Sequence, residues 1–167
     1  MNGITRRRFL GTSVVATTAL AAPWIRRAHG ADTKRIGVVT PLSGPGEFIG
    51  KFVKNGAEVA AALVNEAGGV DGREIALEMR DSKLNPAAAT AAARELLADG
   101  VNLQMGTISS AVALAMGPLM EQENGVVITC GAGTEKLNHE NYSSHVFRVG
   151  DRALSGDQGL DRHRPGP

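Results

Sequence analysis

The sequence predicts an α/β fold, a doubly wound and mostly parallel sheet with helices on both faces. Three observations support this prediction. The composition, 43% hydrophobic and 21% charged, is that of a globular chain. Short apolar strand patterns alternate with longer segments of helical periodicity, and the strands end in loops rich in Gly, Pro or Ser. Such alternation gives parallel strands joined by right-handed crossovers, with helices packed against the sheet.

The first half of the mature sequence predicts two strands and two helices. An apolar run over 36–39 is the first strand, and residues 75–79 alternate as the second. A helix is predicted over 51–67, where apolar or small residues recur at the spacing of one helical face, namely Phe52, Gly56, Val59, Ala60, Leu63 and Ala67. A second, alanine-rich helix begins at Pro86 and extends to residue 98.

The second half continues the same alternation. A short strand is predicted over 101–106, a stronger one over 125–130 and a weaker one over 146–149. The intervening helix, 110–123, carries one apolar face made of Val112, Ala115, Met116, Leu119 and Met120.

Four loops that follow the strands share one edge of this predicted sheet. Ligands of open α/β sheets bind at the carboxyl ends of the strands. These loops contain small and hydroxyl-bearing residues, namely Ser43-Gly44-Pro45, Asp81-Ser82, Ser109-Ser110 and Ala132-Gly133-Thr134. The sequence therefore predicts a polar binding edge.

Ser109 and Ser110 stand where a helix begins, and two interpretations apply to them. Serine is a favoured N-cap residue, so capping alone explains one of the two. No Glu or Gln follows three positions after either serine, and the first turn has no acid, Glu121 being the nearest in the helix. The N–H groups and partial positive charge of this helix start are thus available to an anion such as a carboxylate. We expect the pair to be both a cap and a ligand site.

Other motifs give weak signals for catalysis, metal or nucleotide binding. Asp81 has no second acid beside it, which favours a solvated loop residue over a catalytic carboxylate. His139, Glu140 and His145 do not have the spacing of a metal site, and we expect none. The Gly131–Thr134 segment, GAGT, lacks the third glycine of a dinucleotide fingerprint.

The N-terminus has the pattern of an export signal. Thr5–Leu10 (TRRRFL) precedes a mildly apolar run to Ile25, and small residues around 28–31 suit a signal peptidase. The arginines before Phe9-Leu10 resemble the twin-arginine (Tat) signal. We expect residues 1–31 to be removed, leaving 13 Lys and Arg against 17 Asp and Glu. That net charge of −4 argues against nucleic-acid binding, and the single Cys130 excludes an internal disulfide.

Together, four segments resemble a known family: RIGVVTPLSGPGEFIG, GAEVAAALVNEAGGVDGREIALEMRDSKLNP, GTISSAVALAMGPLMEQENGVVIT and FRVGDRALSGDQG. They are similar to the periplasmic leucine/isoleucine/valine-binding proteins, the substrate-binding receptors of branched-chain amino acid ABC transporters. The likeness extends from about residue 34 to 159. It implies a Tat-type signal peptide over 1–31, the N-terminal lobe of a leucine-binding-protein-like domain over 32–159, and an aberrant tail over 160–167.

The resemblance also implies a function and a site. The family consists of two-lobed periplasmic receptors, not enzymes, which close on an amino acid, need no cofactor or metal, and deliver the ligand to an ABC permease in the inner membrane. The residue at Ser110, beside Ser109, receives the ligand α-carboxylate. The Ala132 carbonyl and the Thr134 hydroxyl receive the α-ammonium, and Ile49 lies against the ligand side chain.

The chain departs from that family after residue 159. Family members continue into a second lobe, whereas LDRHRPGP follows here, so we expect a truncation or frameshift and an incomplete site. A different class of function stays open as the alternative, a small exported α/β enzyme that binds a nucleotide or phosphorylated substrate through the Ser-rich and Gly-rich loops. Asp81 is the only base that we can nominate for it.

Overall fold

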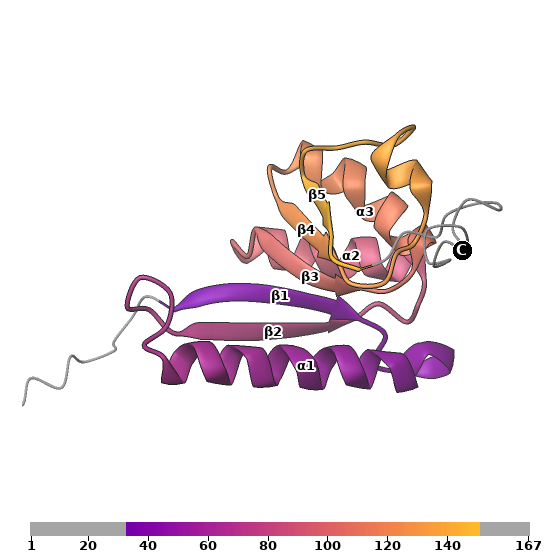
Figure 1. Cartoon of the computed structure of the whole chain (residues 1–167). Coiled ribbons are helices and arrows are strands. Elements are labelled where there is room, and N and C mark those ends of the chain that lie inside the picture. Colours follow the sequence, from indigo (N-terminus) through magenta and orange to yellow (C-terminus); the bar gives the residue numbers. More distant parts are fainter. Residues whose placement is uncertain (1–32, 151–167) are drawn as a thin grey trace, which may run out of the picture. The chain divides into compact units, whose positions relative to one another are not determined.

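The computed structural model describes residues 33–150 (Figure 1). Within them the chain forms five strands, three α-helices and two short 3-10 helices, in the order β1 Lys34–Thr40, η1 Gly44–Gly46, α1 Glu47–Glu66, β2 Ile75–Asp81, α2 Pro86–Ala98, β3 Leu103–Thr107, α3 Ser110–Gln122, β4 Val126–Thr129, η2 Glu135–Asn138 and β5 Val146–Arg148. Every strand and α-helix expected between residues 36 and 149 is present, whereas neither 3-10 helix is predicted by the sequence. The expected signal peptide and tail lie outside the described residues.

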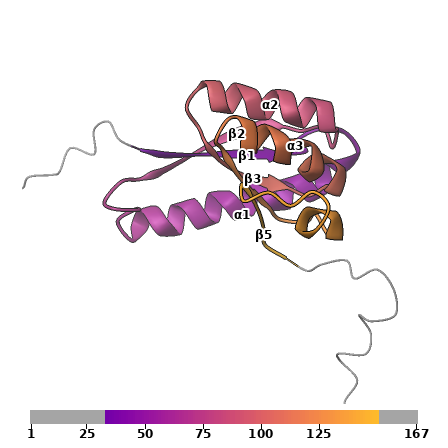
Figure 2. The ribbon, with the colours of Figure 1, turned by 90° about the horizontal axis from the view of Figure 1, so that it is seen from above.

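All neighbouring strands of the sheet pair in parallel, in the order β2-β1-β3-β4-β5. Helix α1 packs on one face, and α2 and α3 cover the other (Figure 2). The α/β prediction is thus confirmed. Since the chain runs from β1 outward to β2 and then returns to β3 on the other side of β1, the strand order reverses between β1 and β3. In open α/β sheets this reversal is the point where ligands bind.

The main hydrophobic core lies between the sheet and the pair α2 and α3. It is built from small and medium side chains, Val39, Ala89, Ala92, Ala93, Leu96, Val101, Val112, Met116, Leu119, Met120 and Val127. The expected apolar face of α3 is therefore the buried one. A buried polar group also joins β3 to α2, because Gln104 Nε2 donates a hydrogen bond to the Ala93 carbonyl oxygen at 3.0 Å.

Helix α1 packs on the sheet through a different face from the one that the sequence pattern indicates. Its buried residues are small, Gly50 and Ala57. A Cβ at Gly50 would lie 1.7 Å from the Pro41 carbonyl oxygen, so only glycine permits this approach. The face marked by Phe52, Gly56, Val59, Ala60, Leu63 and Ala67 is exposed instead. Periodicity identified an apolar face but could not tell whether it points to the sheet or to solvent. The close contact with the sheet selects small residues, so the larger apolar residues face outward.

Side-chain hydrogen bonds fix the ends of two helices. The amide of Asn65, near the end of α1, accepts from the Ile75 N–H at 2.7 Å and donates to the Ile75 carbonyl at 3.0 Å. Asn85 caps α2 by accepting from the Ala88 N–H at 3.0 Å. Across residues 33–150, no helix combines the length and apolar character needed to cross a membrane.

Candidate binding site at the carboxyl edge of the sheet

Gly106 shapes the end of β3, at the reversal point of the sheet. Its φ of +99° lies in the left-handed region, and the pairing with β4 shifts register between Met105 and Thr107. A Cβ there would lie 3.0 Å from Val38 Cγ1. The bulge thus needs glycine, and it directs the chain from the strand into α3.

The start of α3 offers hydrogen-bond donors to a ligand. Ser109 is the N-cap residue, with φ −101° and ψ 132°, and its carbonyl accepts from the Ala113 N–H at 2.9 Å. Its hydroxyl makes no capping bond, so that part of the expectation is wrong. The first turn has no acidic residue, as the sequence indicates. In the described part of the chain, the hydroxyls and N–H groups at this helix start are left available to an anion.

The loop after β4 lies beside this helix start. The N–H groups of Cys130 and Gly131 both donate to the Thr107 carbonyl, at 2.9 and 3.2 Å. Ala132 packs with Ala113 of the first turn of α3 in a small buried cluster. The structure therefore brings the predicted Ala132 and Thr134 to the same edge as Ser110. The thiol of Cys130 is free and only partly exposed.

Arg148 of β5 holds this loop, and the sequence analysis did not identify it. Its Nη1 donates to the Thr134 carbonyl at 2.8 Å and to the Ala132 carbonyl at 3.3 Å. The Thr134 hydroxyl also has a structural role, since it accepts from the Lys136 N–H at 3.3 Å. A carbonyl or hydroxyl oxygen can accept two hydrogen bonds, so both atoms keep capacity for a ligand. The signal in the sequence was an arginine inside the apolar strand VFRV.

Three of the strands, β1, β3 and β4, end in a threonine. Thr40, Thr107 and Thr129 are almost fully buried, and within residues 33–150 their hydroxyls have no hydrogen-bond partner. Ser110 and Thr134, which lie beyond the strand ends, are more exposed than these threonines.

Asp81, which is partly exposed, joins two loops of the edge. Its Oδ1 accepts from the Leu42 and Lys83 N–H groups, both at 2.8 Å, and its Oδ2 from the Ser43 hydroxyl at 2.5 Å. Burial raises the pKa of Asp81, but these hydrogen bonds outweigh it and hold the pKa below its usual value. Asp81 is thus partly exposed, which agrees with the expected solvated residue, but its hydrogen bonds to the loop after β1 were not predicted. The carboxylate is ionised and engaged, which suits a structural role.

Ile49 lies in the first turn of α1, after the loop that follows β1, and its side chain is exposed. It stands at the carboxyl edge, where the resemblance places a contact with the ligand side chain. Nothing in residues 33–150 tests that contact.

The remaining motifs have separate local roles. His139 Nε2 lies 3.6 Å from Glu135 Oε2, while His145 Nδ1 lies 2.6 Å from the Gly125 carbonyl oxygen. No cluster of three His, Cys, Asp or Glu able to hold a metal occurs among residues 33–150. The GAGT segment leads into the four-residue η2, not into the long helix of a dinucleotide site.

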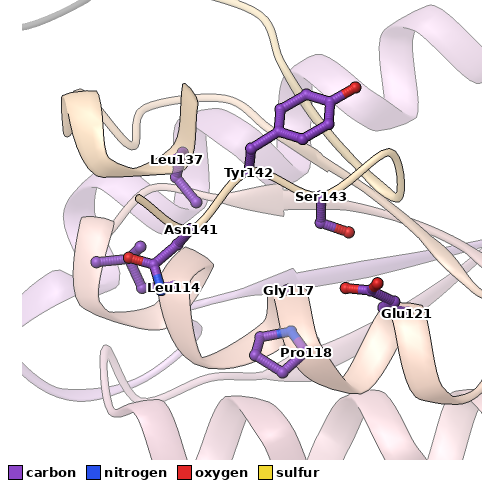
Figure 3. Close-up of a pocket in the computed structure, with 8 residues that line it drawn as sticks. All are labelled: Leu114, Gly117, Pro118, Glu121, Leu137, Asn141, Tyr142 and Ser143. Atoms are coloured by element: carbon purple, nitrogen blue, oxygen red, sulfur yellow. The ribbon is translucent and has the colours of Figure 1, made fainter. Parts of the chain in front are cut away.

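A small cavity lies between α3 and the loop after η2 (Figure 3). Its volume is about 200 Å³, and it is lined by Leu114, Gly117, Pro118, Glu121, Leu137, Asn141, Tyr142 and Ser143. Small-molecule sites usually occupy roughly 300–1,000 Å³. Because none of Ser110, Ala132 and Thr134 lines this cavity, it is distinct from the candidate site.

Comparison with known proteins identifies the family of this chain. A family model described as "Periplasmic binding protein" matches residues 33–157. The chain is 34% identical over 114 residues to Leu/Ile/Val-binding protein homolog 3 of Brucella melitensis, and 32% identical over 122 residues to Leu/Ile/Val-binding protein BraC3 of Rhizobium johnstonii. These alignments cover 68% and 73% of this chain but 31% and 32% of the relatives. The chain thus spans about a third of the length of the curated relatives that it matches.

Solved structures show the same fold. A branched-chain amino acid ABC transporter protein of Rhodopseudomonas palustris matches with a TM-score of 0.67 and 27% identity, over 71% of this chain and 33% of that one. An isoleucine complex of a substrate-binding protein of Streptococcus pneumoniae matches with a TM-score of 0.68 and 24% identity, over 72% of this chain and 34% of that one. Members of the matching family are periplasmic substrate-binding proteins of transport systems. From its sequence match and its sheet, this chain belongs to the periplasmic binding protein family.

Proposed function

We propose that this chain is the ligand-binding part of an ABC transporter receptor for branched-chain or related amino acids. The observation that carries the proposal is the start of α3. It offers unpaired N–H groups and the Ser109 and Ser110 hydroxyls at the reversal point of the sheet, with no acid in the first turn. A ligand α-carboxylate fits this combination of donors and helix dipole.

Acceptors for an α-ammonium lie on the neighbouring loop. The Ala132 carbonyl and the Thr134 hydroxyl each keep a lone pair after their structural bonds, and Arg148 fixes the positions of both residues. Ile49 is the proposed contact for the ligand side chain. A donor group and an acceptor group on adjacent loops discriminate an amino acid from a simple carboxylic acid.

The aligned part of this chain covers 31% and 32% of the two relatives, so we propose that the described residues form one side of an interlobe cleft. A one-sided site leaves much of the ligand in water, and we expect weak affinity, on the order of millimolar.

An NMR titration tests the proposal at that affinity. Leucine, isoleucine and valine, each added to the ¹⁵N-labelled chain, should shift the amide resonances of Ser110, Ala132 and Thr134 in a saturable way. Ser110→Ala should weaken the affinity about tenfold, because it removes one donor to a charged group, whereas the matched change at the exposed Ser144 should have no effect. Saturable shifts confined to the residues of the small cavity would contradict the proposed site.

We also propose that residues 1–31 direct export to the periplasm through the twin-arginine pathway, where an ABC permease is the partner. A reporter fused after residue 31 should be exported, and Arg7→Lys with Arg8→Lys should abolish its export. Export of the double-lysine fusion at the original level would contradict this assignment.

We propose no enzymatic activity for the chain. Asp81, the only base nominated for an enzyme, uses both carboxylate oxygens to join the loops after β1 and β2. No observation in residues 33–150 favours a second function over ligand binding.

A further inference from the structure

The outer face of α1 carries a row of large apolar side chains that nothing in residues 33–150 covers. We call Phe48, Phe52, Val59 and Leu63 the α1 stripe. They are 73%, 63%, 60% and 61% exposed. At 100° per residue they fall within a 60° arc, opposite the buried Gly50 and Ala57. The rings of Phe48 and Phe52 contact each other edge to face, with centroids 4.9 Å apart, so the row is already ordered.

Single exposed apolar residues are ordinary on protein surfaces, but four large ones on one side of a single helix are typical of an interaction surface. The row extends over about 22 Å of helix. Since a phenylalanine buries roughly 150–250 Å² when fully covered, the four side chains expose on the order of 500 Å². Two such rows would bury about 1,000 Å² together, which is the lower bound for a specific interface.

The side chains of the α1 stripe are spaced symmetrically about the midpoint of the row. Reversing the helix about a point between Asn55 and Gly56 places Phe48 opposite Leu63, and Phe52 opposite Val59. At the midpoint, Gly56 has open space around the position of a Cβ, so two helix backbones can approach there. A surface whose side chains are spaced symmetrically about a midpoint can pair with a second copy of itself in an antiparallel, two-fold contact.

From the exposed area and this symmetry we propose that the α1 stripe binds a second copy of this chain through an antiparallel, two-fold contact centred between Asn55 and Gly56. The contact uses the face of α1 turned away from the sheet. It does not depend on the proposed ligand, and its test requires none.

Sedimentation equilibrium of the purified chain measures the proposed association. We expect a monomer–dimer equilibrium, and Val59→Lys or Leu63→Glu should weaken dimerisation at least tenfold by placing a charge in the apolar contact. Val149→Lys is the matched control, because Val149 is equally exposed but lies beyond β5. Circular dichroism verifies that each variant keeps its helical content.

Cysteine cross-linking tests the centre of the contact. In a Cys130→Ser background, Asn55→Cys should form a disulfide-linked dimer on mild oxidation, whereas His139→Cys, another exposed position, should not. A folded chain that remains monomeric at all concentrations would overturn the proposal. So would dimerisation unaffected by Leu63→Glu, or a monomer that uses the stripe to bind lipid vesicles.

Discussion

The Nη1 of Arg148 donates a hydrogen bond to the Thr134 carbonyl at 2.8 Å, which ties the loop after β4 to the edge strand β5. Replacing Arg148 by Ala should release this loop and leave the Ala132 and Thr134 carbonyls without this donor. We expect a loss of about 2–3 kcal/mol in the free energy of unfolding and about tenfold weaker amino-acid binding. Urea denaturation and the NMR titration measure the two effects.

The matched control for this change is Arg94→Ala, because Arg94 is exposed on α2. It should leave both quantities unchanged. If Arg148→Ala binds leucine as well as the original chain does, the loop does not need this support to present Ala132 and Thr134.

Asp81 makes stability depend on acid pH. Its folded-state pKa is lowered, so its contribution is complete above the usual carboxyl value of about 3.9 and is lost as the pH falls through the folded-state value. Asp81→Asn should therefore destabilise the chain at pH 7, and the difference from the original chain should shrink steadily on acidification. Urea denaturation series between pH 7 and pH 2 measure this difference.

Asp71→Asn serves as the comparison for Asp81→Asn. Asp71 is exposed and forms only a surface ion pair with Lys34 at 3.7 Å, so its loss should cost about 0–1 kcal/mol. A destabilisation by Asp81→Asn that is the same at pH 7 and pH 2 would rule out the proposed role of the carboxylate charge.

Gly106→Ala should destabilise the fold for two reasons. Alanine is strained at a φ of +99°, and its Cβ would press on Val38. We expect a loss of about 2–3 kcal/mol in the free energy of unfolding. Gly72→Ala isolates the first reason, because Gly72 has a φ of +75° but nothing within 4 Å of the added Cβ, and it should cost about 1 kcal/mol. Equal losses for the two variants would show that the contact with Val38 has no effect.

Asn65→Ala removes both hydrogen bonds between the end of α1 and the start of β2. We expect it to lower the free energy of unfolding by about 2 kcal/mol, since the backbone groups of Ile75 lose their partner. Asn102→Ala, at an exposed position before β3, should change it by less than about 0.5 kcal/mol. Similar values for the two variants would contradict a linking role for Asn65.

The sequence predicts the strands and α-helices well because each has a clear period and clear end signals. Gly68 and Gly69 end α1, and Pro86 begins α2. It also places Ser110, Ala132 and Thr134 at one edge, because the carboxyl ends of parallel strands meet there. These inferences depend on local pattern and on topology alone.

The properties that were missed depend on contacts between distant residues. The face by which α1 packs is set by Gly50 against Pro41, and periodicity alone cannot give its direction. Arg148 donates hydrogen bonds to two loop carbonyls that lie 14 and 16 residues earlier in the chain. Asp81 accepts hydrogen bonds from the loop after β1, about 40 residues away, so its role in linking the two loops is not visible in the sequence.

The partly exposed Cys130, the single cysteine of the chain, gives the binding edge a natural attachment point for a fluorophore. Its N–H donates a hydrogen bond to the Thr107 carbonyl, so a dye attached to the thiol would have a well-positioned backbone close to Ala132 and Thr134. An environment-sensitive dye would then report ligand arrival as a change in emission. This chain could in that way screen amino acids, amides and aromatic acids in parallel without any engineered residue.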